Sequence, residues 1–144
     1  MREELIAKGP SMAKDRQEPD AELDHPAHEV IGAAIEVHRA LGPGYLEVVY
    51  RRALAVELRL RGLSVQEEEP VAVSFKGVLV GEGRIDLWVG GRLVVELKTV
   101  ETLNPIFKVQ TRSYIKAKGE VLGLLINFNV EFLRDGIVRV VDSS

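Results

Sequence analysis

The sequence predicts an α/β (α+β) domain in which a mixed central sheet is flanked by helices, in the order α-α-β-β-β-α-β-β. Three patterns support this prediction. Apolar residues recur at helical spacing in the first part of the chain, alternate with polar residues in the middle, and form a nearly unbroken run over 121–128. Such a run is typical of a central strand that is covered on both faces.

The length and composition are those of one globular domain. The chain has 144 residues, of which 46% are hydrophobic and 28% charged, and it contains no cysteine. Disulfides, thiolate zinc sites and cysteine nucleophiles are therefore excluded. The net charge of −3 argues against a broad nucleic-acid-coating surface but leaves a local site open. No apolar run approaches the roughly 20 residues of a membrane span, so we expect a cytoplasmic protein without membrane contact.

The beginning of the chain differs in composition from the rest. Residues 1–24 are charged and contain two prolines without any apolar periodicity. We therefore predict a flexible N-terminal tail, followed by a single domain over 25–144. The sequence leaves open whether Met1 or Met12 is the native start.

Two helices are expected next, over 25–41 and 45–61. Asp24 is a candidate N-cap for the first helix. His38 falls in the apolar stripe of that helix, and we favour a hydrogen-bonded core histidine over a ligand. Glu47 lies in the first turn of the second helix, where the helix dipole favours an acid, and this gives Glu47 a purely structural interpretation.

Strands are predicted over 64–75, as a half-buried strand, and over 78–89, with a turn at Lys76-Gly77 between them. A third strand follows a glycine turn. The strand over 78–89 contains Asp86, and the third strand contains Glu96 and Lys98. Side chains alternate between the faces of a strand, so Glu96 and Lys98 share one face.

The length of the glycine turn decides whether Asp86 joins them. A two-residue loop would pair Asp86 with Val95 and put Glu96 on the opposite face. A three-residue loop over 90–92 would pair Asp86 with Glu96. Glycine suits the left-handed residue that a three-residue hairpin loop requires, so we predict the longer loop.

Two adjacent carboxylates would destabilise a sheet, and a divalent cation between them would remove that cost. Oxygen ligands of this kind suit Mg²⁺ or Mn²⁺. An equally weighted alternative is a solvated face on which Arg84, Asp86, Glu96 and Lys98 form salt bridges. The apolar residues on both faces of these strands argue against a fully solvated face, because charges in a covered strand are costly unless paired or bound to metal.

A third helix is predicted over 105–118, with Gln110 and Tyr114 one turn apart on its buried side. We expect this side to be formed by the apolar residues Ile106, Phe107, Val109 and Ala117. A buried glutamine must find a hydrogen-bond partner, which a polar site would supply. After the strand over 121–128, a last pair of short strand segments is expected over 131–141, turning at Asp135-Gly136.

Several of these residues resemble the signatures of the GxxExxY family, which is assigned to the PD-(D/E)XK nuclease-like superfamily. The signatures are Gly44-x-x-Glu47-x-x-Tyr50, Asp86 followed by Glu96-x-Lys98, Gln110-x-x-x-Tyr114, the lead-in over 38–44 and the strand over 123–128. The resemblance covers roughly residues 28–141. One departure is that Arg84-Ile85 precede Asp86, where the superfamily nominally has a proline.

The resemblance implies a restriction-endonuclease-like core and a metal-dependent nuclease that hydrolyses phosphodiester bonds, with DNA favoured over RNA and a homodimer as an expectation. It implies that Mg²⁺, or Mn²⁺, is held by Asp86, Glu96 and the backbone carbonyl of Leu97, with Glu47 as a further metal or water ligand. Lys98 would assist the attacking water, and Gln110 and Tyr114 would position the site or contact nucleic acid. Two alternatives are a non-catalytic nucleic-acid-binding or accessory module and an interaction protein with an ion-pair network.

Overall fold

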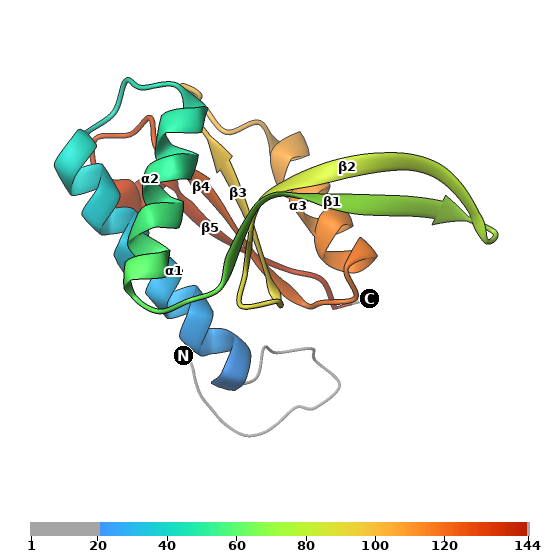
Figure 1. Ribbon diagram of the computed structural model, residues 1–144. Helices are drawn as coiled ribbons and strands as arrows, with labels where there is room; N and C mark the ends of the chain where they lie inside the picture. The colour runs from blue at the N-terminus through green and yellow to red at the C-terminus, as the bar shows by residue number, and fades with distance from the viewer. Residues whose placement is uncertain (1–20, 144) are drawn as a thin grey trace.

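The computed structural model describes residues 21–143, and within them the chain forms three α-helices, five strands and one 3₁₀ helix (Figure 1). In chain order the elements are α1 (Ala21–Leu41), α2 (Glu47–Leu60), β1 (Val65–Phe75), β2 (Val78–Val89), β3 (Leu93–Lys98), α3 (Pro105–Ala117), β4 (Leu122–Asn127), η1 (Leu133–Gly136) and β5 (Ile137–Val141). The predicted fold class is confirmed. None of the described helices has the length and apolar character needed to cross a bilayer.

The five strands form one mixed sheet in the order β1-β2-β3-β4-β5. Neighbouring strands are antiparallel, except that β3 and β4 are parallel and are connected through α3. Helices α1 and α2 cover one face of the sheet, and α3 covers the other (Figure 1). The central strand β4 is buried along its whole length, as the apolar run over 121–128 predicts.

The three-residue glycine turn is also confirmed. Val89 pairs with Leu93, so the loop between β2 and β3 spans residues 90–92. Gly90 and Gly91 have φ angles of 64° and 70°, in the left-handed region that glycine adopts without strain. The Arg92 N–H donates to the Val89 carbonyl at 3.2 Å and closes the turn.

Two boundaries differ from the predictions. Helix α1 begins at Ala21, so Asp24 is inside the helix and pairs with Arg139 at 3.0 Å instead of capping. Residues 1–20 of the predicted tail lie outside the described residues. The strand expected before Asp135-Gly136 is wrong, because the backbone there closes into η1 through a 3.0 Å hydrogen bond from the Asp135 N–H to the Phe132 carbonyl.

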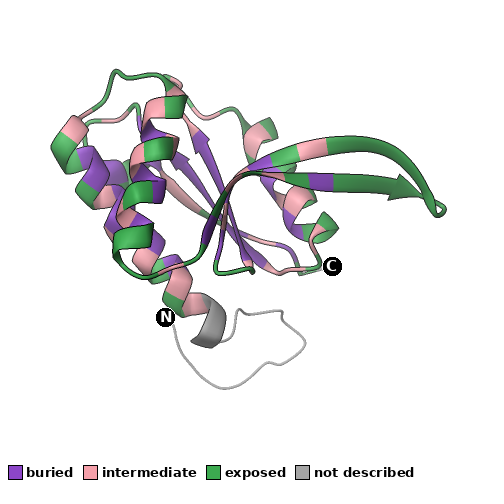
Figure 2. Ribbon diagram, viewed as in Figure 1, coloured by how far each residue is buried: buried purple, intermediate pink, exposed green. Residues whose placement is uncertain are grey.

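The far part of the β1–β2 hairpin extends beyond the sheet as a two-stranded arm (Figures 1 and 2). In β2, only residues 87–89 are paired with β3. The turn of the arm at Lys76-Gly77 is as predicted, with φ angles of 51° and 79°. The prediction that the strand over 64–75 is half-buried throughout is wrong, because Val73 and Phe75 on the arm are exposed. None of the three helices in the described part of the chain reaches this end of the hairpin to cover them (Figure 1).

Candidate active site

The site begins where strands β2 and β3 stop pairing through their backbones. The last regular pair is Leu87 with Val95. Beyond it, the Asp86 N–H donates to Glu96 Oε2 at 2.9 Å, and the Leu97 N–H donates to Asp86 Oδ2 at 2.7 Å. Each carboxylate therefore satisfies a backbone donor that would otherwise be left without a partner between the strands. This reciprocal pair holds the two acids side by side.

The backbone of Leu97 faces the same gap. In a strand, the N–H and C=O of one residue point to the same side, and the Leu97 N–H points to Asp86. The Leu97 carbonyl is therefore directed to the Asp86 side of β3. The next carbonyl, of Lys98, points the other way and accepts the Phe128 N–H at 2.9 Å. The backbone thus adds a carbonyl oxygen to the carboxylate pair.

The carboxylates are electrostatically strained. Glu96 is only 4% exposed, and burial, followed by the charge of Asp86, raises its pKa to about 8. Burial also raises the pKa of Asp86. These shifts have the sign expected for like charges held together in a partly buried site. A cation at this position would stabilise the ionised form of both acids.

Glu47 approaches from the first turn of α2. Burial raises its pKa, and the charge of Asp86 raises it further. The start of α2 is fixed by Tyr50, whose hydroxyl donates to the Gly42 carbonyl at 2.5 Å and accepts the Tyr45 N–H at 3.2 Å. Within the described residues, no three or more His, Asp or Glu side chains are close enough together to share a metal ion. Glu47 is thus near the acid pair without forming one compact ligand set with it.

Lys98 lies on the same strand as Glu96, two residues further on. Its Nζ is 4.3 Å from the centroid of the Phe107 ring, a cation–π contact that holds the half-buried ammonium group. Its positive charge acts on Asp86, Glu96 and Glu47. In each case it lowers the pKa and so opposes the increase that burial causes.

The salt-bridge alternative for this face is not supported by the contacts. In the part of the chain that the structure describes, Lys98 forms no ion pair with Asp86 or Glu96. Arg84, the other cation of the proposed network, pairs with Glu68 at 3.1 Å instead. The acid pair is therefore not neutralised by direct contact with a cation.

Helix α3 brings Tyr114 to the site and leaves Gln110 in solvent. The Tyr114 ring packs on Gly83, where a Cβ atom would meet the ring at 2.8 Å. Burial raises the pKa of Tyr114, and the charge of Glu96 raises it further, which indicates that the phenol faces the acids. Gln110 is exposed, and its Nε2 lies 3.5 Å from the Tyr114 hydroxyl. The expectation of a buried Gln110 is therefore wrong.

The predicted buried side of this helix is wrong for a related reason. Thr111 and Ile115 are buried, whereas the predicted Ile106, Val109 and Ala117 are exposed. Ile115 packs on Gly123 of β4, where an added Cβ would meet its side chain at 2.8 Å. This close fit sets the rotation of α3. It turns Tyr114 and the half-buried Phe107 towards the sheet and Gln110 outwards.

Two residues of the site environment were not predicted from the sequence. The side chain of Arg51 is 18% exposed and pairs with Glu67 and Glu68 at 3.3 and 2.8 Å. Its charge lowers the pKa of Asp86 and of Glu47. Asn127 is buried and binds both the N–H and the C=O of Val100, at 3.1 and 2.8 Å, which fixes the chain just after Lys98. The sequence signal for Asn127 was its position as a polar residue within the apolar run over 121–128.

The family model of the PD-(D/E)XK nuclease superfamily matches residues 24–140. The chain therefore belongs to this superfamily, and the resemblance recognised in the sequence is confirmed at that level. The narrower resemblance to the GxxExxY family stays a sequence-based expectation. No curated protein and no solved structure matches the chain. Nucleases of this superfamily generally use divalent metal ions.

Proposed function

We propose that the protein is a metal-dependent nuclease that hydrolyses phosphodiester bonds of nucleic acid. The observation that supports this most is the reciprocal pair of Asp86 and Glu96, with Lys98 on the same strand face as Glu96. An acid pair that is buried, raised in pKa and without a contacting cation is costly to stability. Such an arrangement is typical of a functional site.

The donor chemistry fits Mg²⁺ or Mn²⁺, which prefer oxygen ligands. Asp86 and Glu96 each use one carboxylate oxygen for a backbone N–H, so the second oxygen of each is available. The Leu97 carbonyl would supply a third oxygen, and Glu47 would act through a bound water. When bound, the ion would polarise a phosphodiester oxygen and lower the pKa of a water molecule.

The neighbouring side chains would act on the phosphate and on the attacking water. The Lys98 ammonium, held over Phe107, would orient the water or stabilise negative charge that develops on the phosphate. The Tyr114 hydroxyl and the Gln110 amide would donate to the substrate from α3. We propose DNA in preference to RNA as the substrate and a homodimer as the active form.

A cleavage assay tests this proposal. Purified protein would be incubated with single- and double-stranded DNA and RNA in Mg²⁺, Mn²⁺ or chelator, beside Glu96→Gln and Lys98→Ala. Lys108→Ala, an exposed cation on α3, is the matched control. We expect metal-dependent cleavage that is lost in both site variants and kept in the control. Cleavage that survives Glu96→Gln, or that persists in chelator, would contradict the assignment. Light scattering with and without substrate tests the homodimer.

A second candidate is a nucleic-acid-binding module that keeps the fold without turnover. It is favoured by the lack, among the described residues, of three acids or histidines gathered closely enough to share a metal ion. It predicts that oligonucleotides bind equally well in Mg²⁺ and in chelator and are not cut. Titration calorimetry with Mg²⁺ distinguishes the two, because the nuclease requires binding that Glu96→Gln weakens.

A further inference from the structure

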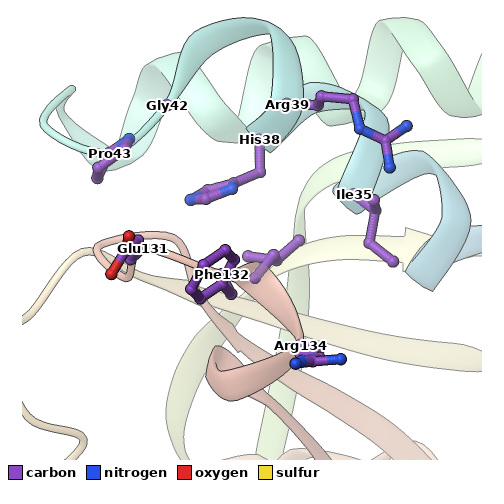
Figure 3. Close-up of a pocket in the computed structure, with 9 residues that line it drawn as sticks. Ile35, His38, Arg39, Gly42, Pro43, Glu131, Phe132 and Arg134 are labelled. Atoms are coloured by element: carbon purple, nitrogen blue, oxygen red, sulfur yellow. The ribbon is translucent and has the colours of Figure 1, made fainter.

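A pocket of about 580 Å³ lies between the end of α1 and the segment that follows β4 (Figure 3). It is formed by the last turns of α1, the Gly42-Pro43 turn and residues 131–134 before and within η1. The lead-in over 38–44, which the sequence analysis singled out, forms one wall. The candidate active site uses none of these side chains.

Two arginines from different elements line this pocket. Arg39 comes from the end of α1 and Arg134 from η1, and both are exposed (Figure 3). Within residues 24–143, neither side chain forms a hydrogen bond or an ion pair. By contrast, the arginines that pair with acids elsewhere in the described chain are Arg51, Arg59, Arg61, Arg84, Arg92 and Arg139. The two pocket guanidinium groups are therefore available to an anion from solution.

The pocket also offers a stacking surface and polar groups for a base. Phe132, on the wall formed by residues 131–134, is 58% exposed (Figure 3). His38 is buried, and its Nε2–H donates to the Val130 carbonyl at 2.8 Å, which confirms the interpretation of a hydrogen-bonded core histidine. Glu131, which lines the pocket, supplies a carboxylate acceptor that suits an exocyclic amino group.

Contacts connect this pocket with the candidate active site. The Phe128 N–H donates to the Lys98 carbonyl, and the Phe128 ring lies 6.3 Å from the His38 ring between centroids. Phe128 also stacks on Tyr50, one helical turn after Glu47, at 4.5 Å. Tyr45, which is 50% exposed, stands on the loop between the two regions. The carboxyl ends of β3 and β4 are therefore linked to the pocket through Phe128.

We propose that this pocket binds one unpaired nucleotide of the substrate strand, away from the phosphate that is cut. The base would stack on Phe132, and its phosphate would bind Arg39 and Arg134, since aromatic stacking and arginine–phosphate pairs are the usual contacts to single strands. The assignment of the nucleotide to a substrate strand rests on the proposed function. The contacts that would bind a nucleotide in the pocket do not depend on nuclease activity. A free mononucleotide has the same chemistry as the strand segment.

Binding by the full chain carrying Glu96→Gln, which prevents cleavage, tests this in chelator with a fluorescent 12-nucleotide DNA. We expect Phe132→Ala to weaken binding about 5- to 150-fold. The double variant Arg39→Gln/Arg134→Gln should weaken it about tenfold or more and reduce the salt slope by about 0.7 for each phosphate that is no longer neutralised. Arg52→Gln, an exposed arginine on α2, is the control and should leave the affinity unchanged.

A second measurement separates the sources of the nucleotide. Amide NMR signals of residues 131–134 are followed while dAMP is added to the same protein. If dAMP shifts these signals and competes with the oligonucleotide, the site also takes free nucleotides. If the variants lose oligonucleotide affinity but dAMP causes no shifts, the site takes a strand only. Shifts with dAMP in a protein that binds no oligonucleotide support the pocket while contradicting the nuclease. Unchanged oligonucleotide affinity in Phe132→Ala and in the double arginine variant, or no oligonucleotide binding and no dAMP shifts, overturns the proposal.

Discussion

The two faces of β3 are separated by a single residue along the chain, yet they carry different tasks. Leu93, Val95 and Leu97 are fully buried against the core beneath α1 and α2. Val94, Glu96 and Lys98 lie on the α3 side. Because side chains alternate, one strand can be apolar on one face and charged on the other without any change of backbone. The side chains that stabilise the core and those of the candidate site therefore lie on opposite faces of β3.

The two faces of β3 also differ in their cover and in how their buried groups are stabilised. Of the helices that the structure describes, α1 and α2 cover the apolar face, whereas α3 covers the other and leaves its own Gln110 in solvent. The splay of β2 and β3 gives Asp86 and Glu96 two backbone donors. These hydrogen bonds favour the charged carboxylates and offset part of the cost of burying them. The following predictions test this separation.

The largest effect on stability is expected from Leu97→Ala, on the sealed face. Removing a fully buried leucine side chain should lower the free energy of unfolding by about 2–5 kcal/mol, from lost transfer energy and the cavity left behind. Urea denaturation measures this. Lys98→Ala, one residue away on the other face, is the control and should change stability by less than about 1 kcal/mol. Equal losses in the two variants would show that both faces of β3 contribute alike to stability.

For catalysis, the large effect is expected from the charged face of β3. Lys98→Ala should reduce kcat about 10²–10³-fold, as for removal of one group that stabilises developing charge. Thermal unfolding should show a folded protein. Lys108→Ala, exposed on α3, should keep wild-type turnover in the same assay. A Lys98→Ala enzyme with unchanged kcat and raised KM would place the lysine in ground-state binding only.

The pH dependence of stability should reveal the acid pair. In the metal-free protein, the pKa of Glu96 is about 8, above its ordinary value of 4.5. The folded state then binds more protons than the unfolded state between these values, so the free energy of unfolding should fall as the pH rises from about 4.5 to about 8. Glu96→Gln should flatten this decline, measured by denaturation at several pH values. Glu101→Gln, an exposed acid, should leave the decline as steep as in the wild type.

The smallest effect concerns the contact between α3 and β2. Gly83→Ala places a Cβ 2.8 Å from the Tyr114 ring and should cost about 1 kcal/mol, the lower end for overpacking, because the half-buried ring can shift. It should also lower turnover, since Tyr114 faces the acids. Gly81→Ala on the same strand has nothing within 4 Å and should be neutral or slightly stabilising. Identical melting temperatures for the two variants would show that Tyr114 does not pack on Gly83.

Much of this architecture was predictable because local rules agree with the tertiary structure. The glycines at 90 and 91 predicted the three-residue loop, and the loop then determined that Asp86 lies beside Glu96. Predictions failed where a contact between distant residues determines the local structure. The rotation of α3 depends on Ile115 fitting against Gly123, two residues that no local pattern connects. The burial of Arg51 likewise depends on acids of β1, 16 and 17 residues away.

By itself, the sequence determined the class of fold, the register of the central hairpin and the presence of two acids and a lysine along it. Periodicity and turn chemistry are local, so they can be read along the chain. Three further features arise only when the elements pack together. Glu96 accepts the Asp86 N–H while Asp86 accepts the Leu97 N–H, Phe107 contacts Lys98, and the arginines at 39 and 134 line one pocket. These features join residues from separate elements, whose distances are set by packing of the whole domain.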